Sequence, residues 1–535
     1  MSDQKSFTVE EVSKHTSPDD LWIIIDGEVY DVTKWQNKHP GGKKILNKVA
    51  GQDATKQFHQ YHDVKRIMKK YGVKYRIGSV AEAGSNKQLT PAKLAANDTA
   101  ADSTSHEAFG DLIPYADPSW YQGYHSPYYN ETHVALRQEI REWVEEYVTP
   151  NIEDWEEEGK IDPAIYKQAG ELGILTGACG LPEFTTKYST KRLKSVKPEE
   201  FDAFHELVIV DEICRCGSGA FAWFLLGGLG IGLPPLFNFG QEAVKQRVIP
   251  GILAGDKRIC LCITEPDAGS DVANIRTSAK KTEDGKHYIV NGVKKWITNG
   301  IFADYFSVAV RTGKPGMGGI SMLLIEKTFP GITTRKIKTQ GMGNSGSTYI
   351  EFDNVKVPVE NIIGKENQGF KVIMSNFNHE RIGIIIQANR FSRLLYEEAV
   401  RHAHRRKTFG KRLIEHDVIR NKLANMAIRC EGVHNWLESL VYQTTLMDSK
   451  EAMFRLGGAI AGAKALSTQT MELCAREASQ IFGGLSYTRG GQGGVVERLY
   501  REVRAYAIPG GSEEIMLDLA MRQALKVHEV LGSKL

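Results

Sequence analysis

The sequence carries almost no net charge and lacks a long hydrophobic run. Its 535 residues have a formal net charge of +3. This balance excludes the strong electrostatic attraction that nucleic acids and acidic membranes exert, so no nucleic-acid partner is expected. No apolar run reaches the roughly 18–20 residues of a membrane-spanning helix, so no membrane span is expected. The polar, acidic start, MSDQKSFTVEEVSKH, argues against a secretory or mitochondrial leader.

Cysteine is also scarce. Seven cysteines are spread along the chain, and no C-x-x-C pair occurs. An odd number without paired spacing predicts a reducing compartment and no structural zinc site. The pairs Cys214/Cys216 and Cys260/Cys262 are expected to pack in the core rather than to react.

The last three residues, 533–535, read Ser-Lys-Leu. A terminal S-K-L is the peroxisomal address that an import receptor reads, so it predicts a peroxisomal protein and that receptor as a partner. The alternative is a final helix that simply frays at VLGSKL.

The N-terminal part predicts a small cofactor domain. Residues 22–35, WIIIDGEVYDVTKW, place two apolar runs around Asp26-Gly27, which is typical of a β-hairpin. The turn at 39–42, HPGG, and the stretch 51–63, GQDATKQFHQYHD, follow. Proline stiffens the turn and glycines keep side chains away, so the histidines are candidates for clamping a planar cofactor.

The HPGG and AGxDAT…F…H motifs of Trp22–Val80 closely resemble a cytochrome b5 domain, here bounded at residues 1–82. The resemblance implies an α+β fold and haem b with His39 and His62 as the axial iron ligands. His59 is a rival for the second position but does not match the family spacing. Two axial histidines fill both iron positions, which favours single-electron transfer.

The next segment, residues 83–110, is rich in Ala, Ser, Thr, Asn and Asp and predicts a flexible linker. Beyond it the length suffices for several further domains. Helical periodicity predicts a helical domain over 111–257, shorter periodicity a β domain over 258–366, and long helical patterns a bundle over 367–532. Asp284-Gly285 and Asn291-Gly292 predict hairpin turns. LLGGLGIGLPPL, residues 225–236, favours tight helix packing over a Rossmann loop.

Four motifs occur in order along this region: CLCITEPDAGSD at 260–271, KKWITNG at 294–300, RRKTFGKRL at 405–413 and QIFGG at 480–484. Together they closely resemble the acyl-CoA dehydrogenase family over about residues 115–530. The resemblance implies an α-helical domain, a β-barrel domain and a C-terminal four-helix bundle. It also implies FAD, an acyl-CoA substrate and a homo-oligomer, a dimer or tetramer.

The family pattern implies a role for residues in each motif. Those expected to touch flavin or substrate, or to back the flavin ring, are Ile263, Thr264, Gly269, Ser270, Trp296 and Thr298. Those expected to reach the FAD of an adjacent subunit are Arg406, Thr408, Phe409, Gln480 and Gly484. Arginine offers pyrophosphate a bidentate contact, although Arg406 lies in a basic run that could be a solvated face.

The dehydrogenation that the resemblance implies needs a carboxylate that removes a proton from the carbon beside the thioester. The pKa of that carboxyl group has to be raised toward neutrality. Many relatives keep this glutamate where YAIPGGSEEI has Gly510. Long-chain and isovaleryl relatives instead place it directly before an arginine on the first long helix of the bundle. In SNFNHERIGIII this is Glu380, followed by Arg381. The resemblance therefore implies Glu380 as the base.

Acids and glycines near Gly510 carry further expectations. Ser512 is the expected cap of the last helix, with Glu513 and Glu514 in its first turn; Ser512 and Glu514 are also placed next to FAD. Backbone N–H groups of Gly510 or Gly511 are candidates to stabilise the thioester oxygen. Arg381 is expected at the active-site edge or CoA, and Arg522 at a CoA phosphate.

These observations predict a peroxisomal acyl-CoA dehydrogenase that forms trans-2-enoyl-CoA in β-oxidation. Its flavin electrons would pass to the tethered haem and on to an external terminal acceptor. Two alternatives stay open: an acyl-CoA oxidase that uses oxygen, and a non-catalytic haem and flavin electron carrier. Stoichiometric peroxide would favour the first, and a flavin that no acyl-CoA bleaches would favour the second.

Overall fold

The computed structural model describes residues 5–36, 39, 43–61, 67–80, 108–180 and 187–532. The chain divides into two compact units, Met1–Ser105 and His106–Leu535. The expected tripeptide at 533–535 and most of the expected linker lie outside the described residues.

The first unit contains a five-stranded sheet in the order β1-β5-β4-β3-β2. Its strands are β1 (Ser6–Phe7), β2 (Thr16–Ser17), β3 (Asp20–Ile25), β4 (Glu28–Asp31) and β5 (Arg76–Val80); its helices include α1 (Val9–Val12), α2 (Lys43–Lys48), α3 (Thr55–Tyr61) and α5 (Val73–Tyr75). The β3–β4 hairpin turns at Asp26-Gly27, where both residues have positive φ angles. The expected hairpin is therefore present.

The second unit begins with helices. These are α6 (Glu131–Trp143), α7 (Ile152–Glu158), α8 (Ala164–Glu171), α9 (Ile174–Gly177), α11 (Ala203–Cys214), α12 (Gly219–Ala222), α13 (Gly228–Phe239) and α14 (Glu242–Leu253). A π-helical turn, η6 (Trp223–Gly227), links α12 to α13. An added Cβ at Gly228 would lie 2.4 Å from the carbonyl oxygen of Ile259, and one at Gly232 would meet Cys260. The glycines thus serve close helix packing, as expected.

This apolar segment also changes one sequence expectation. Gly219–Phe239 is long and apolar enough, by length and composition, to cross a membrane. Most of it is buried within the protein, as in a core helix. The sequence analysis missed this run because its glycines and prolines interrupt the pattern of large apolar residues.

The central part forms a β domain. Its strands are β6 (Ile259–Cys262), β7 (Ser278–Lys281), β8 (His287–Ile297), β9 (Tyr305–Arg311), β10 (Ile320–Glu326), β11 (Ile332–Lys336), β12 (Thr348–Pro358) and β13 (Ile362–Ile363). They follow the order β11-β12-β8-β7-β9-β10-β13, with β6 paired to β9. Cys260 and Cys262 on β6 are buried in this core.

One expected turn in this domain is wrong. Asp284-Gly285 lies in the connection between β7 and β8, as expected, but Asn291-Gly292 lies inside β8. Gly292 has a φ of 146°, and an added Cβ would lie 2.6 Å from the Cα of Thr277. The glycine therefore permits a close approach of backbones within the sheet rather than a chain reversal.

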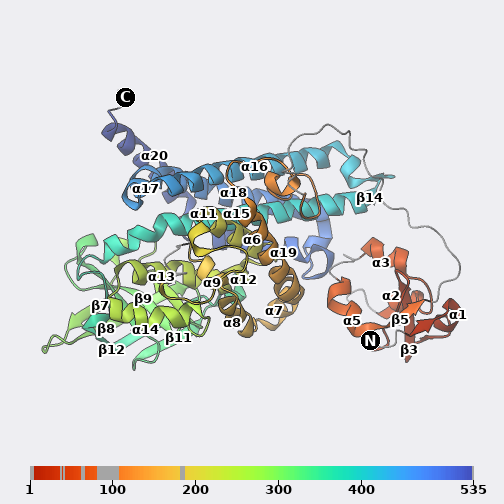
Figure 1. Cartoon of the computed structure of the whole chain (residues 1–535), viewed down its shortest axis with the longest axis horizontal. Helices are drawn as coiled ribbons and strands as arrows, with labels where there is room; N and C mark the ends of the chain where they lie inside the picture. The colour runs from red at the N-terminus through yellow and green to blue at the C-terminus, as the bar shows by residue number, and fades with distance from the viewer. Residues whose placement is uncertain are drawn as a thin grey trace. The chain divides into compact units, whose positions relative to one another are not determined.

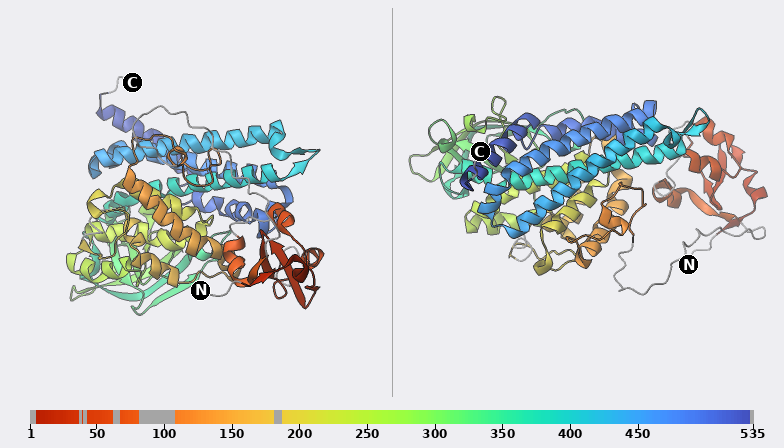
Figure 2. Two further views of the ribbon diagram at one scale, coloured as in Figure 1. Left: turned by 45° about the vertical axis from the view of Figure 1, so that its right-hand side comes forward. Right: turned by 90° about the horizontal axis from the view of Figure 1, so that it is seen from above.

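Long helices make up the C-terminal part. They are α15 (Gly369–Arg405), α16 (Asp417–Leu446), α17 (Ser449–Arg455), α18 (Gly457–Phe482), α19 (Gly494–Ala507) and α20 (Glu513–Val530), with a small hairpin of β14 (Lys407–Thr408) and β15 (Lys411–Arg412). Figure 1 labels α15, α16 and α18, and Figure 2 shows this layer from two further sides. α15 packs on α16 and α18, and α18 also packs on α19 and α20. The expected helical bundle is present.

A buried network of charges ties the first helices to α15. The Arg390 guanidinium, fully buried, donates to Asp117 at 2.7 Å and also pairs with Asp211. The guanidinium of Arg141 pairs with the equally buried Glu212. Each carboxylate of this network is partnered by arginine, which is the condition under which buried charge is tolerated.

Candidate active site

The predicted base, Glu380, faces a pocket between the helical domain, the β domain and the bundle. The pocket encloses about 690 Å³ including its open mouth. Side chains of α11, η6, α13 and α15 line it, together with Thr298 after β8 and Pro509 before α20. Most of its wall is apolar, as is typical of a small-molecule site.

The surroundings of Glu380 raise the pKa of its carboxyl above the ordinary value. Burial is the larger cause, and it outweighs the positive charges of Arg381, Lys464 and His379, which act in the opposite direction. A raised pKa means that the ionised carboxylate binds a proton more strongly and so becomes a stronger base.

Two cations fix the turn that follows α19. Arg381 Nε donates to the carbonyl oxygen of Gly510 at 2.9 Å. Lys464 Nζ donates to the carbonyl oxygens of Ala507 at 2.8 Å and of Gly511 at 2.7 Å. Burial lowers the pKa of Lys464 to about 8, although neighbouring acids raise it. The turn is thereby tied to α15 and α18 beside Glu380.

Gly510 occupies a position that suits glycine. Its φ is +68°, and an added Cβ would lie 2.6 Å from Cδ1 of Ile384 and 3.9 Å from Cγ of Arg381. A side chain at this position would therefore point at α15, close to the turn of helix that carries Glu380. The sequence analysis paired these two positions, and the structure brings them side by side.

The segment after β6 lies against the end of β8. The amide of Lys295 donates to the carbonyl oxygen of Thr264 at 2.9 Å, and Lys294 Nζ donates to that of Ile263 at 2.8 Å. Lys294 also forms a buried ion pair of 2.8 Å with Glu265. The expected Ile263–Ser270 loop and Trp296 thus belong to one neighbourhood.

Trp296 is an exposed aromatic residue in an unusual backbone conformation. Its φ is +60°, and 50% of the residue is accessible. Thr298, two residues further on, lines the pocket of Glu380. Gly269 has open space where a side chain would stand, and Ser270 is exposed. The β domain therefore offers an aromatic face and an open loop next to the pocket.

A second group of predicted residues lies at the other end of α15. From Glu380 to Arg406 the chain runs through 26 residues, about 39 Å of helix at 1.5 Å per residue. Thr408 and Phe409 lie in the β14–β15 hairpin, where Phe409 is 96% exposed. The structure does not bring these three residues to the pocket of Glu380.

Gln480 and Gly484 belong to this distant end. Both are exposed, at the end of α18 and directly after it. His402 near the end of α15 stacks on Phe482 with 4.3 Å between ring centroids, which places the ends of the two helices together.

The start of α20 agrees in part with expectation. Ser512 is its N-cap residue, but its side chain forms no capping hydrogen bond in the part of the chain described. Glu514 is exposed with its pKa lowered by hydrogen bonds at the helix start. Arg522 is exposed and pairs with Asp518 at 2.6 Å, so the structure does not bring it to the pocket.

In the first unit, His39 is half-buried and lies between β4 and α2. His62, the other predicted ligand, lies outside the described residues. The rival His59 is engaged by Asp26, with its Nε2 at 2.8 Å and 2.9 Å from the two carboxylate oxygens. That interaction orients the His59 imidazole toward the turn between β3 and β4.

Comparison with known families assigns every one of these regions. Residues 130–256, 260–355 and 367–525 match the N-terminal, middle and C-terminal domains of acyl-CoA dehydrogenases. Residues 8–81 match the cytochrome b5-like haem/steroid-binding domain. The chain belongs to the acyl-CoA dehydrogenase family. It is an acyl-CoA dehydrogenase with a cytochrome b5-like domain fused in front.

Individual relatives agree. The acyl-CoA dehydrogenase apdG of Emericella nidulans is 40% identical over 427 residues, 79% of this chain and 98% of the relative. The butyryl-CoA dehydrogenase structure from Megasphaera elsdenii superposes with a TM-score of 0.67 at 27% identity, over 75% of this chain and all of that one. An acyl-CoA dehydrogenase of Bacillus anthracis in complex with FAD shares the fold, with a TM-score of 0.66 at 24% identity, over 75% of this chain and 68% of that one.

The residues of this acyl-CoA dehydrogenase fit a flavin at the pocket. The half-exposed Trp296 indole offers a face for a planar ring, and the open backbone at Gly269 leaves room for the ring edge. In the first unit, the half-buried His39 and an apolar core that includes Leu46, Ala50 and Ala54 suit haem as far as the described residues extend.

Two features of the acyl-CoA dehydrogenase site, one beside the pocket and one in its wall, were missed from the sequence. Lys464 is fully buried although lysine is rarely so. His379 Nε2 lies 2.7 Å from Oε1 of Glu206, and both side chains line the pocket. His379 directly precedes Glu380, so its place on the same helix was the available signal; Glu206 and Lys464 carried none.

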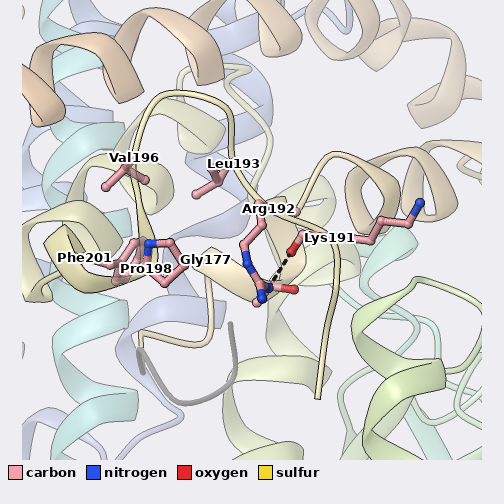
Figure 3. A pocket seen from close by; sticks show the side chains of 9 residues that line it. Gly177, Lys191, Arg192, Leu193, Val196, Pro198 and Phe201 are labelled. Carbon is pink, nitrogen blue, oxygen red and sulfur yellow. Dashed lines mark hydrogen bonds between the residues drawn. The ribbon is translucent and has the colours of Figure 1, made fainter. Parts of the chain in front are cut away.

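A second, shallow pocket lies elsewhere on the helical domain, between α9 and residues 191–201. Figure 3 shows its lining, which includes Gly177, Leu193, Val196 and Phe201. The Arg192 guanidinium there donates to backbone carbonyl oxygens of its own loop. Because the Arg192 guanidinium already binds these carbonyl oxygens, we assign no ligand or reaction to this pocket.

Proposed function

We propose that the enzyme converts a fatty acyl-CoA to the trans-2-enoyl-CoA in β-oxidation, with Glu380 as the base, and that its electrons pass to the fused haem domain. The observation that carries the proposal is the position of Glu380: its carboxyl faces the pocket, burial raises its pKa, and glycine occupies the alternative position 510.

The residues in and beside the pocket have separate roles in the proposed reaction. The Glu380 carboxylate takes the proton from the carbon beside the thioester. Arg381 and Lys464 hold the Gly510-Gly511 turn by its carbonyl oxygens, which leaves its N–H groups as candidate donors to the thioester oxygen. The apolar wall excludes water and keeps the carboxylate basic. Trp296 would hold FAD, which would supply the acceptor for the β-hydrogen and its two electrons.

The distant group supports a homo-oligomer. Arg406 lies about 39 Å of helix away from Glu380, and Thr408, Phe409, Gln480 and Gly484 lie at the same end of α15. One chain therefore presents half of a FAD site at each end of α15, and a second copy would complete both halves. The exposed Phe409 at the hairpin tip fits such a contact.

The haem domain would carry the electrons away. His39 and His62 would hold the haem, which would supply a one-electron acceptor. Electrons would then leave for an external acceptor. The Ser-Lys-Leu tripeptide supports a peroxisomal location in this proposal, with the import receptor as a partner.

An anaerobic optical titration tests the proposal. Full-length protein is mixed with butyryl-, isovaleryl-, octanoyl- and palmitoyl-CoA while the flavin and haem bands are recorded. We expect the flavin to bleach and the haem band then to shift to its reduced position. Bleaching without a haem shift would refute the electron path. Bleaching by none of the acyl-CoAs would refute the function, and stoichiometric peroxide in air would favour an oxidase.

A further inference from the structure

Besides Glu380, the described lining of its pocket contains an ion pair, set in a largely apolar wall that also includes the polar side chains of Thr298 and Gln387. Glu206 on α11 and His379 on α15 face each other across it, with 2.7 Å between Oε1 and Nε2. The Glu206 side chain is 15% exposed and that of His379 33%. Both side chains are therefore largely shielded from solvent, and both still line the pocket.

The pair retains unused hydrogen-bonding capacity. In the described part of the chain this contact uses Nε2 of His379 and Oε1 of Glu206, and the other ring nitrogen, Nδ1 of His379, has no further protein partner there. Oε2 of Glu206 points at Gly180, where an added Cβ would lie 1.9 Å from it. The neighbouring wall is formed by Val210, Leu226 and Ile231. Polar groups on an apolar wall are the means by which pockets orient and select ligands.

A plain alkyl chain fits this arrangement poorly. An alkyl chain that filled the pocket would remove the remaining water from Glu206 and His379 and offer no hydrogen bond in return, which is costly for charged groups. An acyl chain with a hydroxyl or carbonyl group next to Glu206 and His379 would replace the hydrogen bonds of that water. Sites built to hydrogen-bond a substrate group discriminate strongly against analogues that lack it.

We propose that the Glu206–His379 pair is a specificity determinant, and that the enzyme prefers an acyl-CoA whose chain carries a hydrogen-bonding oxygen over the plain fatty acyl-CoA of equal length. This inference rests on the proposed dehydrogenation and names its substrate class. The open space beside Gly230 and Gly383, both in the pocket lining, gives such a substituted chain the width it needs.

The test compares matched substrates in the full-length holoenzyme. Straight acyl-CoAs of equal length carry either a hydroxyl or a methyl group at each carbon from C4 onward, and kcat/KM is measured by flavin reduction with an artificial acceptor. The variant is the double substitution Glu206→Leu with His379→Leu, because removal of one partner alone would leave the other charge buried and unpaired. The control, Glu451→Gln with Arg455→Gln, removes an exposed ion pair from α17.

We expect wild type and control to prefer the hydroxylated chain at one position by at least about tenfold. The double variant should lose or reverse that preference while its flavin content stays unchanged. Equal kcat/KM for both chains in wild type would overturn the inference and leave the dehydrogenation intact. A double variant that slows on both chains by the same factor would also overturn it, since the pair would then only position Glu380. If this double variant does not bind flavin, Glu206→Met with His379→Phe, which removes both charges at nearly unchanged side-chain volume, is used to measure the same ratio of kcat/KM values.

Discussion

Replacement of Glu380 by glutamine tests the base directly. The change keeps the size of the side chain and removes the proton acceptor. A positioned general base contributes about 10²–10⁴ in rate, so we expect the flavin-bleaching rate with the preferred acyl-CoA to fall at least about 100-fold. At about 1.36 kcal/mol per factor of ten, this corresponds to about 2.7 kcal/mol of barrier. Stopped-flow absorbance under anaerobic conditions measures it.

The pH dependence sharpens this test. Because burial raises the pKa of Glu380 above the ordinary 4.5, the carboxylate is lost as pH falls through that raised value. The wild-type bleaching rate should therefore rise with pH over a range that begins above 4.5 and then level off. The Glu380→Gln variant should lack this acidic limb.

Controls separate the base from its neighbours. Glu513→Gln examines another acid, at the start of α20, which contacts Thr468 and Gln469 rather than the pocket lining. Glu451→Gln, on exposed α17, should bleach at the wild-type rate. The reasoning is refuted if Glu380→Gln bleaches as fast as wild type with a full complement of flavin, and it is redirected if Glu513→Gln is the slow variant.

Three further changes test the packing around the site. Gly510→Ala should lower the free energy of unfolding by about 1–2 kcal/mol, because φ is +68° and the new Cβ meets Ile384; Ile384→Val, which removes the contacting atom, should recover part of it in urea titrations. Glu502→Gln should flatten the pH dependence of Tm: burial raises the Glu502 pKa to about 7, so wild-type stability falls as pH rises from 4.5 through 7, and a parallel slope in both proteins would contradict this. Arg390→Met should cost about 3–5 kcal/mol by leaving buried carboxylates unpaired, and a loss below 1 kcal/mol would contradict the network's role.

The fold was readable because its signals are local and repeated. Helical periodicity and the four motifs of the second unit placed helices, β domain and bundle in their order. Asn291-Gly292 shows where local signals fail. The pair is a strong turn signal by itself, but the approach of Thr277 across the sheet decides its conformation, and that approach is invisible in the neighbouring sequence.

The site was readable to the extent that motifs carry it. Glu380 and Gly510 were paired from the sequence because position 510 has a glycine where many relatives have the catalytic glutamate, which points to the alternative position 380. Lys464 and Glu206 escaped notice because each comes from a helix without a motif and acts through a contact with a residue far away in the chain. Their roles depend on burial and distance, which only the folded chain defines.

The hydrogen bonds of the two cations explain why Glu380 can remain basic beside them. A glutamate in a salt bridge with arginine would have its pKa lowered by about 1–3 units and would be a poor base. Here Arg381 and Lys464 direct their hydrogen bonds to backbone carbonyl oxygens of the turn, and neither forms an ion pair with Glu380 in the described part of the chain. Their charges hold the turn in place while burial keeps the carboxyl pKa raised. The same two residues thus organise the turn without neutralising the base.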